Sequence, residues 1–232
     1  MLWFNPIFWV FVGPALLLAL YAQWRVRSAY NKWGKVPNNL GLAGAQAAEK
    51  LLNETGLYGV KIQGIAGQLT DNYNPREKTL NLSESTARLR SVAALAVVAH
   101  EIGHAQQDAA NFALLKLRGG LVPAVNFGSH LGPILFIIGY FLQFQPIMWI
   151  GVAFFSMAFV FALITLPVEL NASSRALKLL RTNGLLVGNE ELGGARAVLS
   201  AAALTYVAAL LQALGQLLYY VLLASGGSRR RR

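Results

Sequence analysis

The 232-residue chain contains no cysteine. This absence excludes a disulfide framework and a thiolate metal site. Any bound metal must therefore be held by histidine, aspartate or glutamate side chains. Such candidates are few, because the chain has three histidines and ten acidic residues.

Charged residues are also scarce, at 13% of the chain, whereas soluble domains carry about 25%. Hydrophobic residues make up 55% and gather in long runs, which indicates an integral membrane protein. The net charge of +10 is compatible with nucleic-acid binding or with contact to anionic lipid. The basic residues border the apolar runs and form no patch interleaved with aromatic residues. We therefore expect membrane lipid as a partner and no nucleic acid.

Four apolar segments approach the roughly 20 residues that a membrane-spanning helix needs. They cover residues 6–24, about 121–144, about 147–167 and about 202–224. The first lacks a basic leader and a cleavage site, so we interpret it as a retained anchor. Only the stretch "QFQP" joins the second and third segments, which predicts an antiparallel hairpin.

The polar regions predict smaller elements. An amphipathic helix is expected over residues 41–57, short strands in 60–69 and 78–82, a turn over 71–77 and a helix over about 91–111. A helix that opens at Glu169 and a glycine-rich loop with Glu190 and Glu191 are expected after the third apolar segment.

Lysine and arginine cluster after the first apolar segment, before the second and after the third. All three clusters fall on one side of the predicted membrane, which should be the cytoplasmic side. The terminal run of four arginines, residues 229–232, conflicts with this if the fourth segment spans. Either the fourth segment is interfacial or re-entrant, or the other basic residues determine the orientation in the membrane despite the tail.

The stretch "AHEIGHA" carries a metalloprotease motif. His100 and His104 lie four residues apart, so on a helix both imidazoles can face one metal ion. Glu101 can then act as general base toward water that the metal acidifies. Gly103 would let another element approach this helix closely. The alternative is a plain helix with two ordinary histidines.

A catalytic zinc site usually takes three protein ligands. Asp108 is about 12 Å from His100 along the helix axis, so it is either an outer partner or a solvated helix charge. His130, within a span, is expected to be packed or hydrogen-bonded there. Glu169 returns to the same membrane side through the hairpin, and we expect it to be the third ligand. Asn171 is either a hydrogen-bonding group behind the ligands or a polar residue of a helix start.

The stretches "LRSVAALAVVAHEIGHAQQ", "LPVELNASSRAL" and "NYNPREKTLNLSE" resemble the YugP-like family of bacterial membrane zinc metallopeptidases. The resemblance implies a neutral gluzincin-type peptidase with Zn²⁺ on His100, His104 and Glu169, and with Glu101 as base. The layout is also similar to heat-shock membrane proteases and CAAX prenyl proteases. Those relatives carry an aspartate in the glutamate motif, whereas this chain has Asn171 and Ser173.

The sequence thus predicts a mainly α integral membrane protein of about four transmembrane helices, with a small α+β zincin-like cytoplasmic domain. We expect an N-terminal anchor (1–24), a zincin-like part (25–118), a transmembrane hairpin (119–168), a glutamate helix (169–200), and a C-terminal membrane helix with a basic tail (201–232). The resemblance and the charge pattern together predict a multi-pass protein of the bacterial inner membrane with its active site facing the cytoplasm.

The leading hypothesis is an endopeptidase that cleaves membrane or membrane-proximal polypeptides. A polypeptide substrate would pair with an edge strand, for which residues 78–83 are the candidate. Arg175 could polarise the scissile carbonyl, or pair with Glu84 or Asp108. The alternative functions are a structural zinc protein that assists membrane-protein assembly, and an intramembrane protease. Partners of the membrane-protein type or a homo-oligomer fit the same composition.

Overall fold

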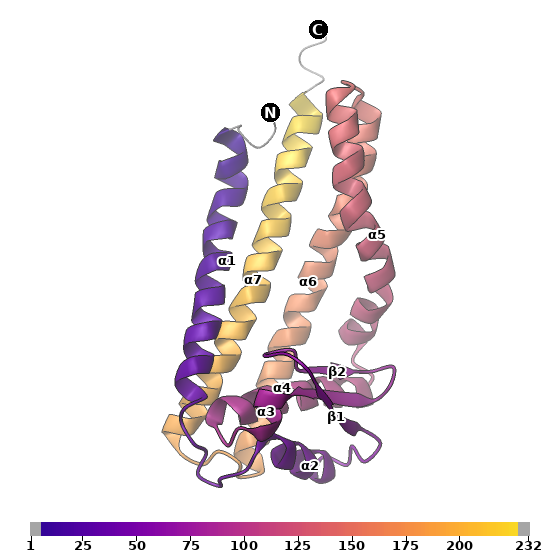
Figure 1. The fold of residues 1–232 in the computed structure, drawn as a ribbon. Helices are drawn as coiled ribbons and strands as arrows, with labels where there is room; N and C mark the ends of the chain where they lie inside the picture. Colours follow the sequence, from indigo (N-terminus) through magenta and orange to yellow (C-terminus); the bar gives the residue numbers. More distant parts are fainter. Residues whose placement is uncertain (1–5, 227–232) are drawn as a thin grey trace. The chain divides into compact units, whose positions relative to one another are not determined.

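The computed structural model describes residues 6–226, and these are mostly helical (Figure 1). Four helices are long and apolar enough to cross a membrane, in agreement with the four predicted apolar segments. They are α1 (Pro6–Trp33), α5 (Ala113–Phe141), α6 (Gln145–Thr182) and α7 (Asn189–Gly226). The prediction about the arginine tail falls outside the described residues.

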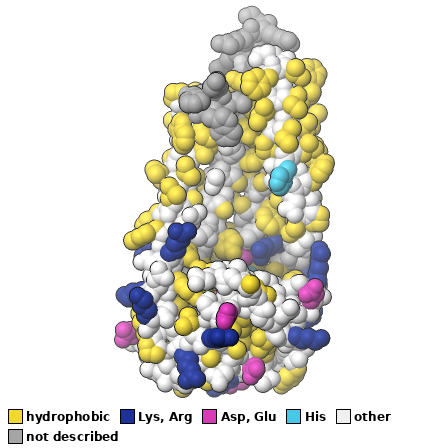
Figure 2. All heavy atoms as spheres, viewed as in Figure 1, with side chains coloured by type: hydrophobic (Ala, Val, Ile, Leu, Met, Phe, Trp, Pro, Cys, Tyr) yellow, Lys and Arg dark blue, Asp and Glu magenta, His cyan; other side chains and the backbone are white. Residues whose placement is uncertain are grey.

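The chain forms two compact units. The first contains the described residues up to Tyr21, Leu117–Pro167 and those from Thr205 onward. The second contains Ala22–Lys116 and Val168–Leu204. In the space-filling view, hydrophobic side chains dominate the visible face of the long helices, whereas charged side chains gather over the small elements of the second unit (Figure 2).

Close helix packing holds the first unit together. The predicted hairpin is confirmed, since α5 ends at Phe141 and α6 begins at Gln145. A Cβ atom added at Gly132 would lie 2.7 Å from the backbone nitrogen of Phe155, so glycine is needed where α5 and α6 meet. Around this contact the aromatic ring of Phe136 stacks on Tyr220 with a centroid distance of 4.1 Å.

The second unit combines a small sheet with short helices. The sheet has the order β1-β3-β2, with β1 (Lys61–Ile65) parallel and β2 (Asn72–Asn74) antiparallel to the central β3 (Thr79–Ser83). The helices are α2 (Gly44–Glu54), α3 (Glu84–Arg88) and α4 (Val92–Ala109). The predicted helices and two strands are present. The predicted turn over 71–77 is partly wrong, because it contains β2.

The helix that carries the motif is the centre of this unit. Ser91 caps α4 by accepting a hydrogen bond from the backbone N–H of Ala94 at 3.2 Å. Thirteen of the 18 residues of α4 are buried, because α2, the sheet and α6 surround it. The apolar residues packed in this core include Leu51, Leu80, Leu82, Leu95, Ile102, Leu180 and Leu185.

Two predictions about helix ends are wrong. Glu169 does not open a helix, since α6 continues through Pro167 to Thr182; long apolar helices tolerate such prolines. The predicted loop around Glu190 and Glu191 is the first turn of α7. Glu191 is buried there and accepts hydrogen bonds from the backbone N–H groups of Asn39 and Val187, so it is not a solvent-facing turn residue.

Candidate metal centre

Helix α4 presents the two histidines of the motif side by side. Their rings meet edge to face with a centroid distance of 4.8 Å. His104 is buried and His100 is partly buried. The four-residue spacing therefore produces the shared helix face that the sequence predicts.

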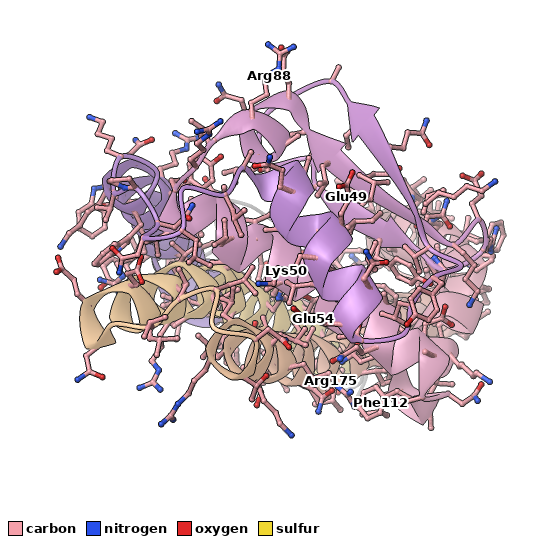
Figure 3. The ribbon with its side chains drawn as sticks, turned by 90° about the horizontal axis from the view of Figure 1, so that it is seen from below. Glu49, Lys50, Glu54, Arg88, Phe112 and Arg175 are labelled. Carbon is pink, nitrogen blue, oxygen red and sulfur yellow. The ribbon has the colours of Figure 1, made fainter. Side chains whose placement is uncertain are left out.

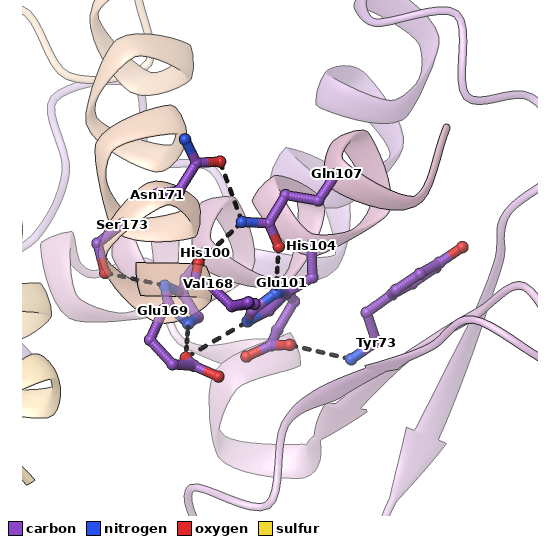
Figure 4. A network of polar contacts seen from close by, with 9 residues as sticks. All are labelled: Tyr73, His100, Glu101, His104, Gln107, Val168, Glu169, Asn171 and Ser173. Carbon is purple, nitrogen blue, oxygen red and sulfur yellow. Dashed lines mark hydrogen bonds and ion pairs between the residues drawn. The ribbon is translucent and has the colours of Figure 1, made fainter. Parts of the chain in front are cut away.

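Helix α6 brings Glu169 to this face (Figure 4). Its Oε2 atom lies 3.2 Å from Nε2 of His100 and 3.5 Å from Nε2 of His104. One ligand atom from each of these three residues falls within 4.8 Å of the others. Two imidazoles and a carboxylate are a donor set that zinc accepts in catalytic sites, so the residues present fit a zinc ion.

Burial and charge act on the Glu169 carboxyl in opposite directions. Only 2% of this residue is exposed, and burial alone would raise its pKa. The hydrogen bonds and positive charge of His100 and His104 outweigh that effect and lower the pKa well below its usual range. Glu169 is therefore held as the carboxylate, which is the form that binds a metal.

Helix packing sets the distance between α4 and α6. A Cβ atom on Gly103 would lie 2.7 Å from the carbonyl oxygen of Ala172. This contact confirms that Gly103 permits the close approach of another element. Since Ala172 is three residues after Glu169, the same contact places the carboxylate against the histidines.

Neutral side chains hold the two imidazoles from behind. Nδ1 of His104 lies 3.0 Å from Oε1 of Gln107, and Nδ1 of His100 lies 3.2 Å from Oγ of Ser173. An amide oxygen can only accept, so Nδ1 of His104 carries the proton and Nε2 remains free for a metal. The site thus has an amide and a hydroxyl in the positions where many zinc sites have a carboxylate.

Gln107 also ties the histidine helix to the glutamate helix. Its Nε2 group donates to the carbonyl of Val168 at 2.8 Å and to Oδ1 of Asn171 at 3.0 Å. Gln107 is fully buried, and these contacts satisfy both of its amide protons. Asn171 therefore reaches the histidines only through Gln107. Sequence reasoning missed this glutamine, although its position three residues after His104 places it on the ligand face.

Glu101 points from the same helix toward the sheet. Its Oε2 atom accepts a hydrogen bond of 2.9 Å from the backbone N–H of Tyr73, in β2. Burial raises the pKa of the Glu101 carboxyl, and the neighbouring histidines offset only part of this rise. A carboxyl whose pKa is moved toward neutrality is suited to accept and return a proton.

Asp108 lies apart from the three candidate ligands. Its Oδ2 atom accepts a hydrogen bond of 2.7 Å from the phenol of Tyr73 and another from Lys78. Burial would raise the pKa of Asp108, but the bond from Lys78 leads the effects that lower it. Asp108 thus fastens β2 to α4 and contacts neither imidazole.

The edge strand differs from the predicted one. Residues 78–83 were expected to form it, but β3 is the central strand and is paired on both sides. The strand beside Glu101 is β2, which lies at the end of the sheet order. A three-residue strand in a segment rich in asparagine and proline gives no periodic signal.

The remaining candidates lie elsewhere. Nε of Arg175 donates to Oδ1 of Asn171 at 2.8 Å. Of the two roles that the sequence left open for Arg175, the pairing with Glu84 or Asp108 is wrong, because Glu84 pairs with Arg88 and Asp108 with Lys78. Nδ1 of His130 lies 2.7 Å from the carbonyl of Asn126 in its own helix.

Comparison with known proteins agrees with this geometry. A family model described as "Putative neutral zinc metallopeptidase" matches residues 8–225. The chain is also 43% identical over 213 residues to a Bacillus subtilis (strain 168) protein named "Putative membrane protease YugP", covering 92% of this chain and 94% of that protein. No solved structure matches the chain. The predicted cofactor, Zn²⁺, is confirmed by this family match.

Proposed function

Because this chain belongs to the neutral zinc metallopeptidase family, we propose that it is a membrane-anchored zinc endopeptidase that hydrolyses membrane or membrane-proximal polypeptides. His100, His104 and Glu169 hold the zinc ion, and Glu101 is the general acid–base residue. The observation that carries this proposal is the convergence of three ligand atoms within 4.8 Å beside a buried glutamate.

The residues of the chain divide the reaction among them. Zinc, when bound, supplies Lewis-acid polarisation of a carbonyl oxygen and acidifies water. Glu101 takes a proton from the water whose oxygen attacks the peptide carbon, and it returns that proton to the leaving nitrogen as the C–N bond breaks. The N–H of Tyr73 holds Oε2 of Glu101, which leaves Oε1 for the proton transfer.

The outer edge of β2 is the proposed binding strand for the substrate. An extended polypeptide can add to a sheet edge through main-chain hydrogen bonds. β2 is an edge strand whose backbone contacts Glu101, so a polypeptide paired with it would lie beside the candidate base. We further propose that the protein is a multi-pass protein of the bacterial inner membrane, with this site on the cytoplasmic side.

The decisive experiment compares Glu101→Gln with Glu169→Ala in purified protein. Glu101→Gln should retain zinc and lower peptide cleavage by about 10²–10⁴-fold, the usual contribution of an acid–base group. Glu169→Ala should lose both zinc and cleavage, because it removes a ligand. Elemental analysis and cleavage of an unfolded polypeptide are measured on the same preparations.

The exposed Glu190 provides a matched control, since Glu190→Ala also removes one carboxylate from the second unit. It should keep zinc and activity at the wild-type level. Full zinc retention in Glu169→Ala would remove Glu169 from the ligand set. Wild-type cleavage by Glu101→Gln would show that Glu101 is not the base, and a wild type without any cleavage would favour a structural zinc protein.

A further inference from the structure

A row of exposed side chains follows one face of α5, within the first unit. Its members are spaced four residues apart and are all exposed: Val122, Asn126, His130, Ile134 and Ile138. Gly128 and Gly132, two residues before and after His130, are positions where a Cβ atom would lie 2.8 and 2.7 Å from backbone atoms of α6. Two residues turn an α-helix by about 200°. His130 therefore points away from α6, and the row lies on the face that the hairpin leaves uncovered.

Two members of the row are polar, although the helix is otherwise apolar. His130 stands near the middle of the span, 12 residues after Arg118 and 11 before Phe141. Hydrocarbon offers no hydrogen bonds, so an unpaired amide or imidazole at that depth costs free energy. Ionisable residues in membrane-spanning helices are rare for this reason and usually have a partner. The exposed pair of Asn126 and His130 is therefore expected to have one.

Exposed polar side chains of the second unit differ in this respect. Figure 3 shows several of them on α2 and α3, among them Lys50, Glu54 and Arg88, and all three are exposed. Water can satisfy such groups, and Lys50 and Glu54 also lie 3.8 Å apart as an ion pair. Within a membrane Asn126 and His130 have no water, and in the part of the chain that the structure describes no charged residue pairs with His130.

The polar pair offers both donors and acceptors. Nδ1 of His130 lies 2.7 Å from the backbone carbonyl oxygen of Asn126, and a carbonyl oxygen can only accept, so Nδ1 carries the proton. In the neutral ring Nε2 is then an acceptor. The amide of Asn126 has two donor protons and an acceptor oxygen, and no residue among those described bonds to it. Donors and acceptors thus stand one helical turn apart, and a copy of the same pair can satisfy them.

We propose that this row is the docking face for a second copy of the chain, packed about a two-fold axis along the membrane normal. Copies that insert in the same orientation hold Asn126 and His130 at the same depth, so each polar pair meets its counterpart. A different helix would need a polar group at that one depth. Side chains spaced by four residues form a ridge that suits a right-handed helix crossing. The inference rests on the proposed membrane placement and goes beyond the peptidase activity.

Disulfide cross-linking tests the docking face directly, because the native chain has no cysteine. Ile134→Cys places one thiol on the row, one turn after His130, and isolated membranes are treated with an oxidant. We expect a disulfide-linked pair of this chain, identified by mass spectrometry. Leu17→Cys in α1 is the control, because Leu17 is 69% exposed against 53% for Ile134 but is not on the row. Ile134→Cys protein that stays monomeric, links to a different protein, or links no better than Leu17→Cys would overturn the proposal.

Leucine substitutions measure the contribution of the polar groups. Asn126→Leu and His130→Leu should each raise the dissociation constant of the pair by about 3- to 20-fold, the range for hydrogen bonds between membrane helices. Energy transfer between labelled copies, followed as vesicles are diluted with lipid, gives this constant. Gln212→Leu is the matched control, because it removes an exposed amide from α7 and should leave the constant unchanged. Wild-type constants for both row variants, or an equal loss in Gln212→Leu, would overturn the proposal.

Leucine suits both a helix and hydrocarbon, so the row variants should fold. Their zinc content should equal that of the wild type, because all three candidate ligands lie in the second unit. If a row variant loses zinc and is misfolded, the cross-linking of Ile134→Cys decides, since it keeps both polar groups.

None of these measurements uses cleavage, so a second copy on the row is detectable even in a chain that hydrolyses nothing. Carbonate extraction of the membranes tests the proposed membrane placement on its own. A chain that carbonate releases would refute that placement and the docking face with it. A chain that stays in the membrane as a monomer would refute the docking face alone.

Discussion

The two compact units bury their residues in different ways. In the second unit α4 has 13 of its 18 residues buried within the chain. In the four long helices, only 17–22% of the most apolar window is buried, so most of their hydrophobic side chains face outward. A chain in water would hide such surface. The difference indicates that the second unit makes its own core, whereas the long helices are built for an apolar surrounding.

Both units nevertheless use glycine where helices approach each other. Gly132 in α5 lets α6 approach within the first unit, and Gly103 in α4 lets α6 approach within the second. In the first unit the contact brings aromatic rings together. In the second it brings a carboxylate to two imidazoles. The same kind of close glycine contact thus stabilises an apolar bundle in one place and sets the distances among the three candidate metal ligands in the other.

The largest expected effect concerns the membrane topology of the chain, which tests the contrast between the two units. Single cysteines are introduced at Lys35 and Asn189 in the second unit and at Phe144 between α5 and α6, all of which are exposed. The native chain has no cysteine, so each variant carries one thiol. With a membrane-impermeant maleimide and intact cells, we expect labelling of Phe144→Cys only, because the positive-inside pattern places the second unit in the cytoplasm.

Permeabilised cells provide the control, since all three thiols should then react. Labelling of Lys35→Cys but not Asn189→Cys in intact cells would separate the two chain segments that build the metal site, and the proposed centre could not form. Labelling of both, with protection of Phe144→Cys, would keep the centre but reverse its proposed orientation.

The next effect concerns Gln107, whose amide joins the two helices of the site. Gln107→Leu keeps an apolar stem and removes the contact to His104 and both contacts to α6. Loss of a group that orients a metal ligand typically weakens metal binding 10–100-fold. We expect a decrease of that size in zinc affinity, measured by competition with a chelator.

Gln106→Leu is the matched control, because it changes the neighbouring residue of the same helix and should leave zinc affinity near the wild-type value. Equal affinity in the two variants would show that Gln107 does not orient His104. Gln107→Glu sharpens the result: it can still accept from His104 but cannot donate to the carbonyl of Val168. It should therefore retain more affinity than Gln107→Leu and be less stable than the wild type.

Much of the site could be predicted from local patterns. The HEIGH spacing places two candidate ligands, His100 and His104, on one helix face, and the absence of cysteine leaves few choices for a third. Glu169 could be proposed because the hairpin returns the chain to the same side. These inferences depend on helix periodicity and on connection length, and both can be recognised in a single sequence.

The missed features depend on contacts between distant segments. The three residues of β2 form a strand because β3 pairs with them and because Glu101 accepts from Tyr73. Glu191 can be buried because backbone N–H groups 4 and 152 residues away in sequence donate to its carboxylate and offset the cost of removing it from water. Neither the partners of β2 nor the backbone donors to Glu191 can be recognised from local propensity. Pro167 favours a helix boundary in sequence reasoning, but α6 continues through it.

The smallest effect compares two helical glycines of the second unit. Gly103→Ala would place a methyl group 2.7 Å from the Ala172 carbonyl oxygen, whereas a methyl group at Gly193 in α7 would meet no atom within 4 Å. Each change gains up to about 1 kcal/mol of helix propensity. Gly103→Ala also incurs an overpacking cost of about 1–3 kcal/mol, because backbone atoms cannot rotate away. We therefore expect Gly193→Ala to be neutral or stabilising and Gly103→Ala to lose up to about 2 kcal/mol.

Thermal unfolding of both variants in the same detergent, without zinc, measures this difference free of any contribution from metal binding. Zinc affinity then separates packing from ligand placement. If the contact at Gly103 sets the position of α6, Gly103→Ala should bind zinc more weakly than Gly193→Ala, because the displaced helix carries Glu169 away from His100 and His104. The contrary result is a Gly103→Ala protein that is as stable as Gly193→Ala protein and binds zinc as tightly. That result would mean that α4 and α6 can separate without cost, and that the glycine contact does not determine the geometry of the centre.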